Sequence, residues 1–124
     1  MIKVLNSAEQ SYKEAGTPFE LKSCFAHLRS FLEHLHRVTA KAIANTSGVP
    51  LAKDNWGTAT LYLRENGLFT PQHENFVTSL YTLMSDTSVH PLGADREYAR
   101  LLRNMVIEYG AMFLSMLDNR GVKI

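Results

Sequence analysis

The amphipathic segment between residues 95 and 118 constrains the fold more than any other part of the sequence. Its apolar residues recur at steps of three and four, so they share one face of a helix. These residues are Tyr98, Leu101, Leu102, Met105, Val106, Tyr109, Met112, Phe113, Met116 and Leu117. We therefore predict a helix from about Asp95 to Asp118, which the following Asn119-Arg120-Gly121 ends.

A second long helix is predicted between residues 18 and 45. Thr17 is a suitable N-cap, Pro18 fits the first helical position and Glu20 completes a capping box. A seam of near-heptad spacing follows, made of Leu21, Phe25, Leu28, Leu32, Leu35, Thr39 and Ala42 and widened by Cys24, Phe31 and Val38. The segment TSGVP at 46–50 breaks the helix. A helix of roughly 40 Å is typical of the centre of a bundle.

Three shorter helices complete the prediction. A capping box at Ser7 predicts one helix from about 7 to 15. Another is expected over 54–65, ended by Asn66-Gly67, with an inward face of Trp56, Ala59, Tyr62 and Leu63. The last begins at Thr70-Pro71 and stops near Ser85, with an inward face of Phe76, Val77, Leu80, Leu83 and Met84. Residues 86–93 are then a loop.

These segments together predict an all-α fold. No segment has the alternation of a strand without fitting a helix better. We expect a helical bundle of about five helices dominated by two long ones, near 18–45 and 95–118. The 124 residues fit a single domain over 1–124.

Composition indicates which partners the chain can bind and in which cellular compartment it occurs. The formal net charge is +1, so nucleic-acid binding needs a local cationic patch rather than an overall field. The single cysteine, Cys24, falls on an apolar helical face, which indicates core packing in a reducing compartment. The N-terminal sequence lacks the apolar core of a signal peptide, and no run reaches the roughly 20 apolar residues of a membrane span. We expect a cytoplasmic protein that does not enter the membrane.

Three arginines form the first candidate site. Arg96, Arg100 and Arg103 fall within roughly 60° of one another, on the face opposite to the apolar one. Guanidinium groups near a helix N-terminus favour an anion, so this stripe is a candidate contact for RNA. The alternative is an ordinary solvated face that Glu97 partly neutralises. His90 precedes the helix and is a candidate acid/base group, because histidine titrates near neutrality.

The segment Ser85–Gly110, SDTSVHPLGADREYARLLRNMVIEYG, resembles the terminal helix region of HEPN-like domains (higher eukaryote and prokaryote nucleotide-binding). Their signature is an arginine, often followed by a polar residue, and then a histidine after four to six intervening residues. Arg103-Asn104 matches the first half, and Glu108 stands where the histidine is expected. A histidine ahead of the last helix, here His90, is similar to a subgroup in defence-associated proteins.

The resemblance implies a small helical bundle, commonly dimeric, of the kind found in toxin–antitoxin, abortive-infection and phage-defence systems. The first hypothesis is a non-catalytic dimerising or partner-binding module of a prokaryotic defence or mobile-element system, which Glu108 favours. The alternative is a metal-independent ribonuclease, in which Arg103 stabilises the phosphorane charge and His90 moves protons, with Asn104 near the site. Two long apolar seams also predict a homodimer through the long helices. RNA and another protein are the other candidate partners.

The helix predicted over 18–45 contains further candidates. Arg29 fits the signature with His34 or His36, and Arg29 and His36 would share one shoulder of the helix beside Glu33. Glu33 and His36 have the spacing of half a di-iron site, and His27 and His34 that of half a zinc site. Histidines on a helix shoulder are more typical of a surface or an interface. Because further ligands and cofactor motifs are missing, we expect no metal and no cofactor.

Overall fold

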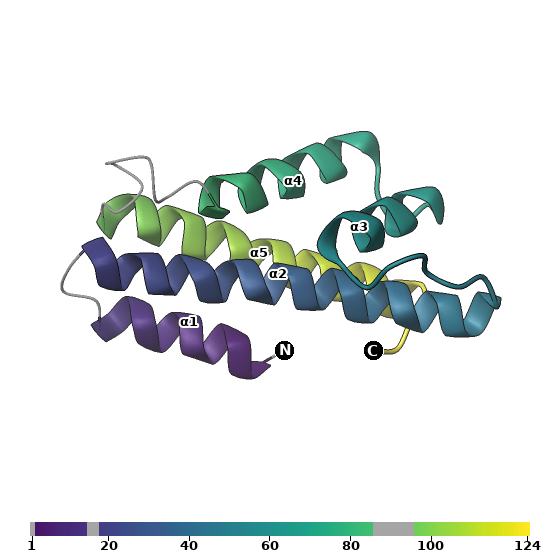
Figure 1. Cartoon of the computed structure of the whole chain (residues 1–124), viewed down its shortest axis with the longest axis horizontal. Coiled ribbons are helices and arrows are strands. Elements are labelled where there is room, and N and C mark those ends of the chain that lie inside the picture. The colour runs from purple at the N-terminus through teal and green to yellow at the C-terminus, as the bar shows by residue number, and fades with distance from the viewer. Residues whose placement is uncertain (1, 15–17, 86–95) are drawn as a thin grey trace.

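The computed structural model describes residues 2–14, 18–85 and 96–124 of the chain. Every regular element in these ranges is a helix, which confirms the all-α prediction (Figure 1). The helices are α1 (Ile2–Glu14), α2 (Pro18–Ser47), α3 (Trp56–Glu65), α4 (Pro71–Ser85) and α5 (Arg96–Asn119). The boundaries of α2 to α5 fall within two residues of the predicted ones. None of the described helices is both long and apolar enough to cross a membrane.

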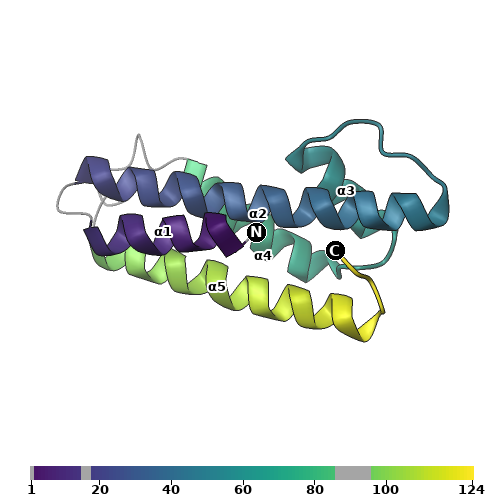
Figure 2. The same ribbon diagram turned by 90° about the horizontal axis from the view of Figure 1, so that it is seen from below.

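The two long helices, α2 and α5, run along the length of the bundle (Figures 1 and 2). Helix α1 packs against the N-terminal half of α2, and α3 and α4 pack against other parts of α2. Figure 2 shows α5 along one edge of the bundle, and none of the other described helices lies on its outer side. The outer side of α5 is therefore a surface.

The core lies between α2 and α5 and is completed by side chains of α3 and α4. Its largest fully buried apolar members are Phe25, Leu28, Leu32, Leu35, Leu63, Val77, Leu80, Leu102, Val106, Phe113 and Leu117. Cys24 is fully buried, as predicted from its place on the apolar face. Burial, and to a lesser degree Glu9, raises the pKa of the Cys24 thiol to about 11, so the thiol stays protonated and unreactive at neutral pH.

Gly110 lets α5 pack closely against a buried aromatic ring of α2. A Cβ atom at Gly110 would lie 2.9 Å from Cζ and 3.0 Å from Cε2 of Phe31. The Phe31 ring itself is buried. Glycine thus serves here as a packing residue, because any side chain would press on the ring.

The prediction for the first helix was wrong at its start. Helix α1 begins at Ile2 rather than Ser7. The Ser7 hydroxyl donates to the carbonyl oxygen of Lys3 at 2.9 Å, which is a bond within the helix and not a cap. The capping signal at Thr70 is confirmed, since its Oγ1 accepts from the backbone N–H of His73 at 3.2 Å. Asn55 caps α3 through a bond from the N–H of Thr58, so α3 begins just after it, later than predicted.

Four apolar side chains predicted to face inward are exposed. They are Phe76 (44%), Leu83 (43%), Leu101 (53%) and Met112 (38%). The apolar stripes of α4 and α5 are wider than the faces that the other helices cover. Periodicity shows which residues share a face, but it does not show how much of that face a neighbour covers.

Candidate functional site

The predicted arginine stripe lies on α5, and two of its members are held by carboxylates. Arg100 is exposed and donates from Nε and Nη2 to Oε2 of Glu97, at 3.1 and 2.9 Å. Arg103 lies 3.5 Å from Oε1 of Glu9 on α1, and its side chain is only 19% exposed. Arg96 is exposed at the first position of the helix. The stripe is therefore partly neutralised by Glu97, as the solvated-face alternative expected, and also by Glu9, which the sequence did not suggest.

Arg103 and Asn104, the familiar half of the predicted signature, contact each other. Nε and Nη2 of Arg103 donate to Oδ1 of Asn104, at 3.2 and 3.0 Å. This contact and the ion pair with Glu9 turn the guanidinium towards α1. His90 lies outside the described residues.

Glu108, which stands where the signature expects histidine, lies on the rim of an apolar groove between α4 and α5. The groove has a volume of about 530 Å³. Its lining consists of Gln72, His73, Phe76, Asn104, Met105, Glu108, Tyr109 and Met112. Nδ1 of His73 is buried and has no hydrogen-bond partner among the described residues. The groove thus combines exposed apolar anchors with a few polar groups, as partner-binding grooves commonly do.

A second apolar hollow lies on the other side of α5, next to α1. Its volume is about 760 Å³, and Lys3 is the charged residue of its lining. The rest of the lining is Leu5, Phe31, Ile107, Gly110, Ala111, Leu114 and Ile124. Leu114 and Ile124 are exposed to solvent.

Between these two hollows, α5 forms a ridge, which we define by Arg100, Leu101, Asn104, Glu108 and Ala111. All five side chains are exposed. Helix α5 has an outer side that no other described helix covers (Figure 2). An exposed ridge with both polar and apolar side chains thus separates the two apolar hollows.

His36 is the residue that the sequence prediction placed wrongly, because it lies in the core and not on a helix shoulder. It is fully buried. Its Nδ1 lies 2.9 Å from Oγ1 of Thr60 and its Nε2 lies 2.6 Å from the hydroxyl oxygen of Tyr109. In a neutral imidazole one nitrogen donates and the other accepts, so both bonds can form. Burial lowers the pKa of His36 to about 3, so the ring is neutral at physiological pH.

Aromatic rings enclose His36. The imidazole stacks on Trp56 with ring centroids 4.4 Å apart, and Trp56 stacks on Tyr81 at 4.3 Å. The hydroxyl of Tyr81 donates to Oε1 of Glu33 at 2.5 Å. Burial and this bond raise the pKa of Tyr81 to about 12. Glu33 and His36 therefore bind different partners, which removes the half di-iron site.

The other histidines of α2 do not form a metal site with described residues. His34 is exposed and His27 is half-buried. No cluster of three or more histidine, cysteine, aspartate or glutamate residues that could hold a metal occurs among the described side chains. Arg29 approaches Glu33 at 3.9 Å, whereas Arg37 turns to Asp54.

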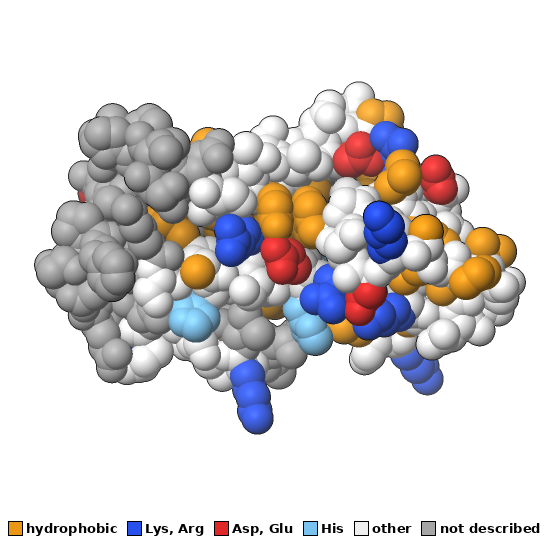
Figure 3. Space-filling view, viewed as in Figure 1, with side chains coloured by type: hydrophobic (Ala, Val, Ile, Leu, Met, Phe, Trp, Pro, Cys, Tyr) orange, Lys and Arg blue, Asp and Glu red, His pale blue; other side chains and the backbone are white. Residues whose placement is uncertain are grey.

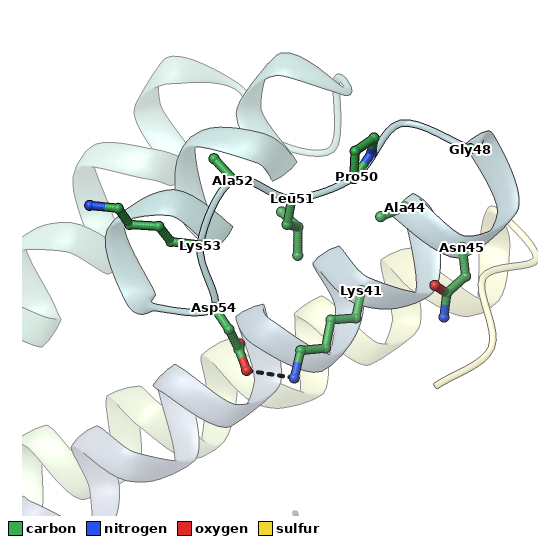
Figure 4. A pocket seen from close by; sticks show the side chains of 9 residues that line it. All are labelled: Lys41, Ala44, Asn45, Gly48, Pro50, Leu51, Ala52, Lys53 and Asp54. Atoms are coloured by element: carbon green, nitrogen blue, oxygen red, sulfur yellow. Dashed lines mark ion pairs between the residues drawn. The ribbon is translucent and has the colours of Figure 1, made fainter.

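A hollow of about 560 Å³, lined by both polar and apolar side chains, lies between the C-terminal part of α2 and the loop that leads to α3. Figure 4 shows the Lys41–Asp54 ion pair at its edge and Lys53 pointing away from it. Asp54 also accepts a bidentate pair of bonds from Arg37, at 2.8 and 2.9 Å. Bonds from Arg37 and then Lys41 lower the pKa of Asp54. Because Asp54 holds Lys41 and Lys53 points away, this hollow is a weak candidate for an anion site.

The face drawn in Figure 3 is also a weak candidate for binding an anion. Cationic and acidic side chains are intermixed there over α2 and α3. An RNA backbone favours a surface of one charge sign. The face in Figure 3 is therefore a poor candidate for binding RNA, and the α5 ridge with its two hollows is the candidate site for binding a partner.

Comparison with known proteins adds no family to this description. No protein-family model, curated protein or solved structure matches the chain.

Proposed function

We propose that this protein is a non-catalytic dimerising module, which acts by binding a partner through the α5 ridge and the hollows beside it. Following the resemblance to HEPN-like domains, we place it in the cytoplasm, in a prokaryotic defence or mobile-element system. The observation that carries the proposal is Glu108. At the position where a catalytic histidine is expected, the chain has a carboxylate on the rim of an apolar groove.

The apolar surface supports binding rather than catalysis. Phe76 and Met112 are both more than one-third exposed beside the groove. Exposed apolar patches with a polar rim mark interaction sites in soluble proteins. A second copy is the partner we propose, because the same ridge and the same hollows are then covered on both chains at once.

The alternative of a metal-independent ribonuclease has one observation in its favour, the contact between Arg103 and Asn104. Against it, the Arg103 guanidinium is already engaged by Glu9. A phosphate would have to compete with that carboxylate.

Sedimentation and light scattering of the purified chain over a range of concentrations test the dimer. We expect Met112→Lys to weaken the dimer by ten-fold or more, which corresponds to about 1.4 kcal/mol, because a charge then enters the groove. Leu61→Lys is the matched control, since Leu61 is 42% exposed on α3, away from the groove. A wild-type chain that stays monomeric at high micromolar concentration overturns the dimer proposal.

Incubation of the protein with total RNA and EDTA tests the alternative. We expect no cleavage by the wild-type chain. Metal-independent cleavage that disappears in Arg103→Ala would replace the non-catalytic proposal with the ribonuclease. Cleavage that persists in this variant would indicate a contaminating nuclease.

A further inference from the structure

The order of charges along the α5 ridge suggests how two copies meet, and this inference rests on the proposed dimer. Arg100, Asn104 and Glu108 are all exposed and follow one another at four-residue intervals. Successive members of such a row differ by about 40° around the helix axis, so the row stays on one face. From one end to the other it carries a cation, a neutral amide and an anion. Such a row complements a reversed copy of itself.

We infer that a second copy binds with its α5 reversed against this one, on a two-fold axis beside Asn104. Residues at equal distances before and after Asn104 then face each other, as in any two-fold contact. Arg100 of each copy donates to Glu97 of its own chain and meets Glu108 of the other copy with its remaining N–H groups, so the interface contains two ion pairs. The two Asn104 side chains meet on the axis, where neither places a charge against its own kind. The Oδ1 of each already accepts from Arg103 of the same chain, so the NH2 group is what remains to donate.

Helix packing supports this geometry. When two helices cross at about −50°, their rows of every fourth residue run parallel to each other. At this angle the row of Arg100, Asn104 and Glu108 lies along the reversed row of the other copy. Beyond the axis the crossing α5 leans with the row towards Glu108 and Met112, so the groove between α4 and α5 loses exposed apolar surface.

The charges favour a two-fold axis beside Asn104 over an axis beside another residue of the row. An axis beside Glu108 would place two carboxylates together, and an axis beside Arg100 would place two guanidinium groups together. Parallel rows would place each charge against its own kind. Among the described residues, no ion pair involves Glu108, so its carboxylate is available to a second copy.

Charge reversal tests the register. We expect Arg100→Glu and Glu108→Arg each to weaken self-association by ten-fold or more, since each places like charges together twice. An equimolar mixture of the two variants should form a heterodimer, with affinity restored to within about three-fold of the wild-type dimer, because both cross-pairs are again opposite in sign. The double variant should recover in the same way. Arg120→Glu, an exposed reversal just beyond α5, is the control and should leave the dimer unchanged.

The outcomes separate this inference from the proposed function. If the wild-type chain dimerises and the single variants dimerise equally well, the register is wrong and the dimer proposal stands. If Arg100→Glu and Glu108→Arg each weaken self-association, but neither their mixture nor the double variant regains the wild-type affinity, the Arg100–Glu108 pairing is also wrong. A monomeric wild-type chain overturns the proposed dimer itself. Circular dichroism of each variant distinguishes lost association from lost folding.

Discussion

His36 joins three helices through one buried side chain. It lies on α2 and bonds Thr60 of α3 and Tyr109 of α5. A buried polar group is costly when it is unpaired, but here both ring nitrogens have a partner. Since Tyr109 also lines the groove between α4 and α5, this bond fixes one wall of the candidate partner-binding site.

The burial of His36 predicts that the protein loses stability in mild acid. Its pKa is about 3 in the folded chain, against 6.5 for ordinary histidine. Between these values the unfolded chain binds a proton that the folded chain does not, so stability falls as pH decreases from 6.5 towards 3. The slope from this residue is at most about 1.4 kcal/mol per pH unit. Urea unfolding across this range measures it.

His36→Gln should flatten this slope, because glutamine does not titrate, although the variant will be less stable at pH 7. His27→Gln is the control, since His27 is half-buried on the same helix and has no place in the core network. If both variants keep the wild-type slope, another group causes the acid sensitivity.

Among the elements, the contact of α5 with α2 depends on the missing side chain of Gly110. Alanine would favour the helix by up to about 1 kcal/mol, but its Cβ would press on the Phe31 ring, and overpacking costs about 1–3 kcal/mol. We expect Gly110→Ala to lower the free energy of unfolding by about 1 kcal/mol in urea titrations. In a Phe31→Leu background the clash is relieved, and the same change should become neutral or stabilising. Equal effects in both backgrounds would show that the ring is not the cause.

The loop between α2 and α3 is fastened to α2 by Asp54. This carboxylate accepts from Arg37 and binds Lys41 at 2.6 Å. We expect Asp54→Asn to speed hydrogen exchange of amides in residues 49–55, because the neutral amide holds these cations less strongly. Glu65→Gln, at the exposed end of α3, is the control and should leave this exchange unchanged. Unchanged exchange in the Asp54 variant would mean that packing alone holds the loop.

At the scale of the whole molecule, the sequence predicted the helices better than their contacts. Periodicity and capping residues are local, so Pro18 and Pro71 marked the starts of α2 and α4 correctly. The placement of His36 could not be predicted, because its partners are 24 and 73 residues away in the sequence. Its spacing of four residues from Leu32 was the available signal, since it put His36 near the apolar seam.

The candidate site was predicted in part. The sequence identified Asn104, Glu108 and the arginines of α5, but it assigned Phe76 and Met112 to the core. Whether an apolar residue of a wide stripe is covered depends on how the helices cross, which no local pattern contains. The ion pair of Arg103 with Glu9 has the same origin, because it joins α5 to α1.

The stack of Tyr81, Trp56 and His36 gives the protein an internal fluorescent probe. Trp56 is the only tryptophan of the chain, so all indole emission comes from this one place. Emission should therefore change when the stack separates on unfolding, and it should respond to an occupant of the groove only when Tyr109 and the imidazole move with it. Tryptophan fluorescence thus reports the state of the core in unlabelled protein, separately from measurements of molecular mass.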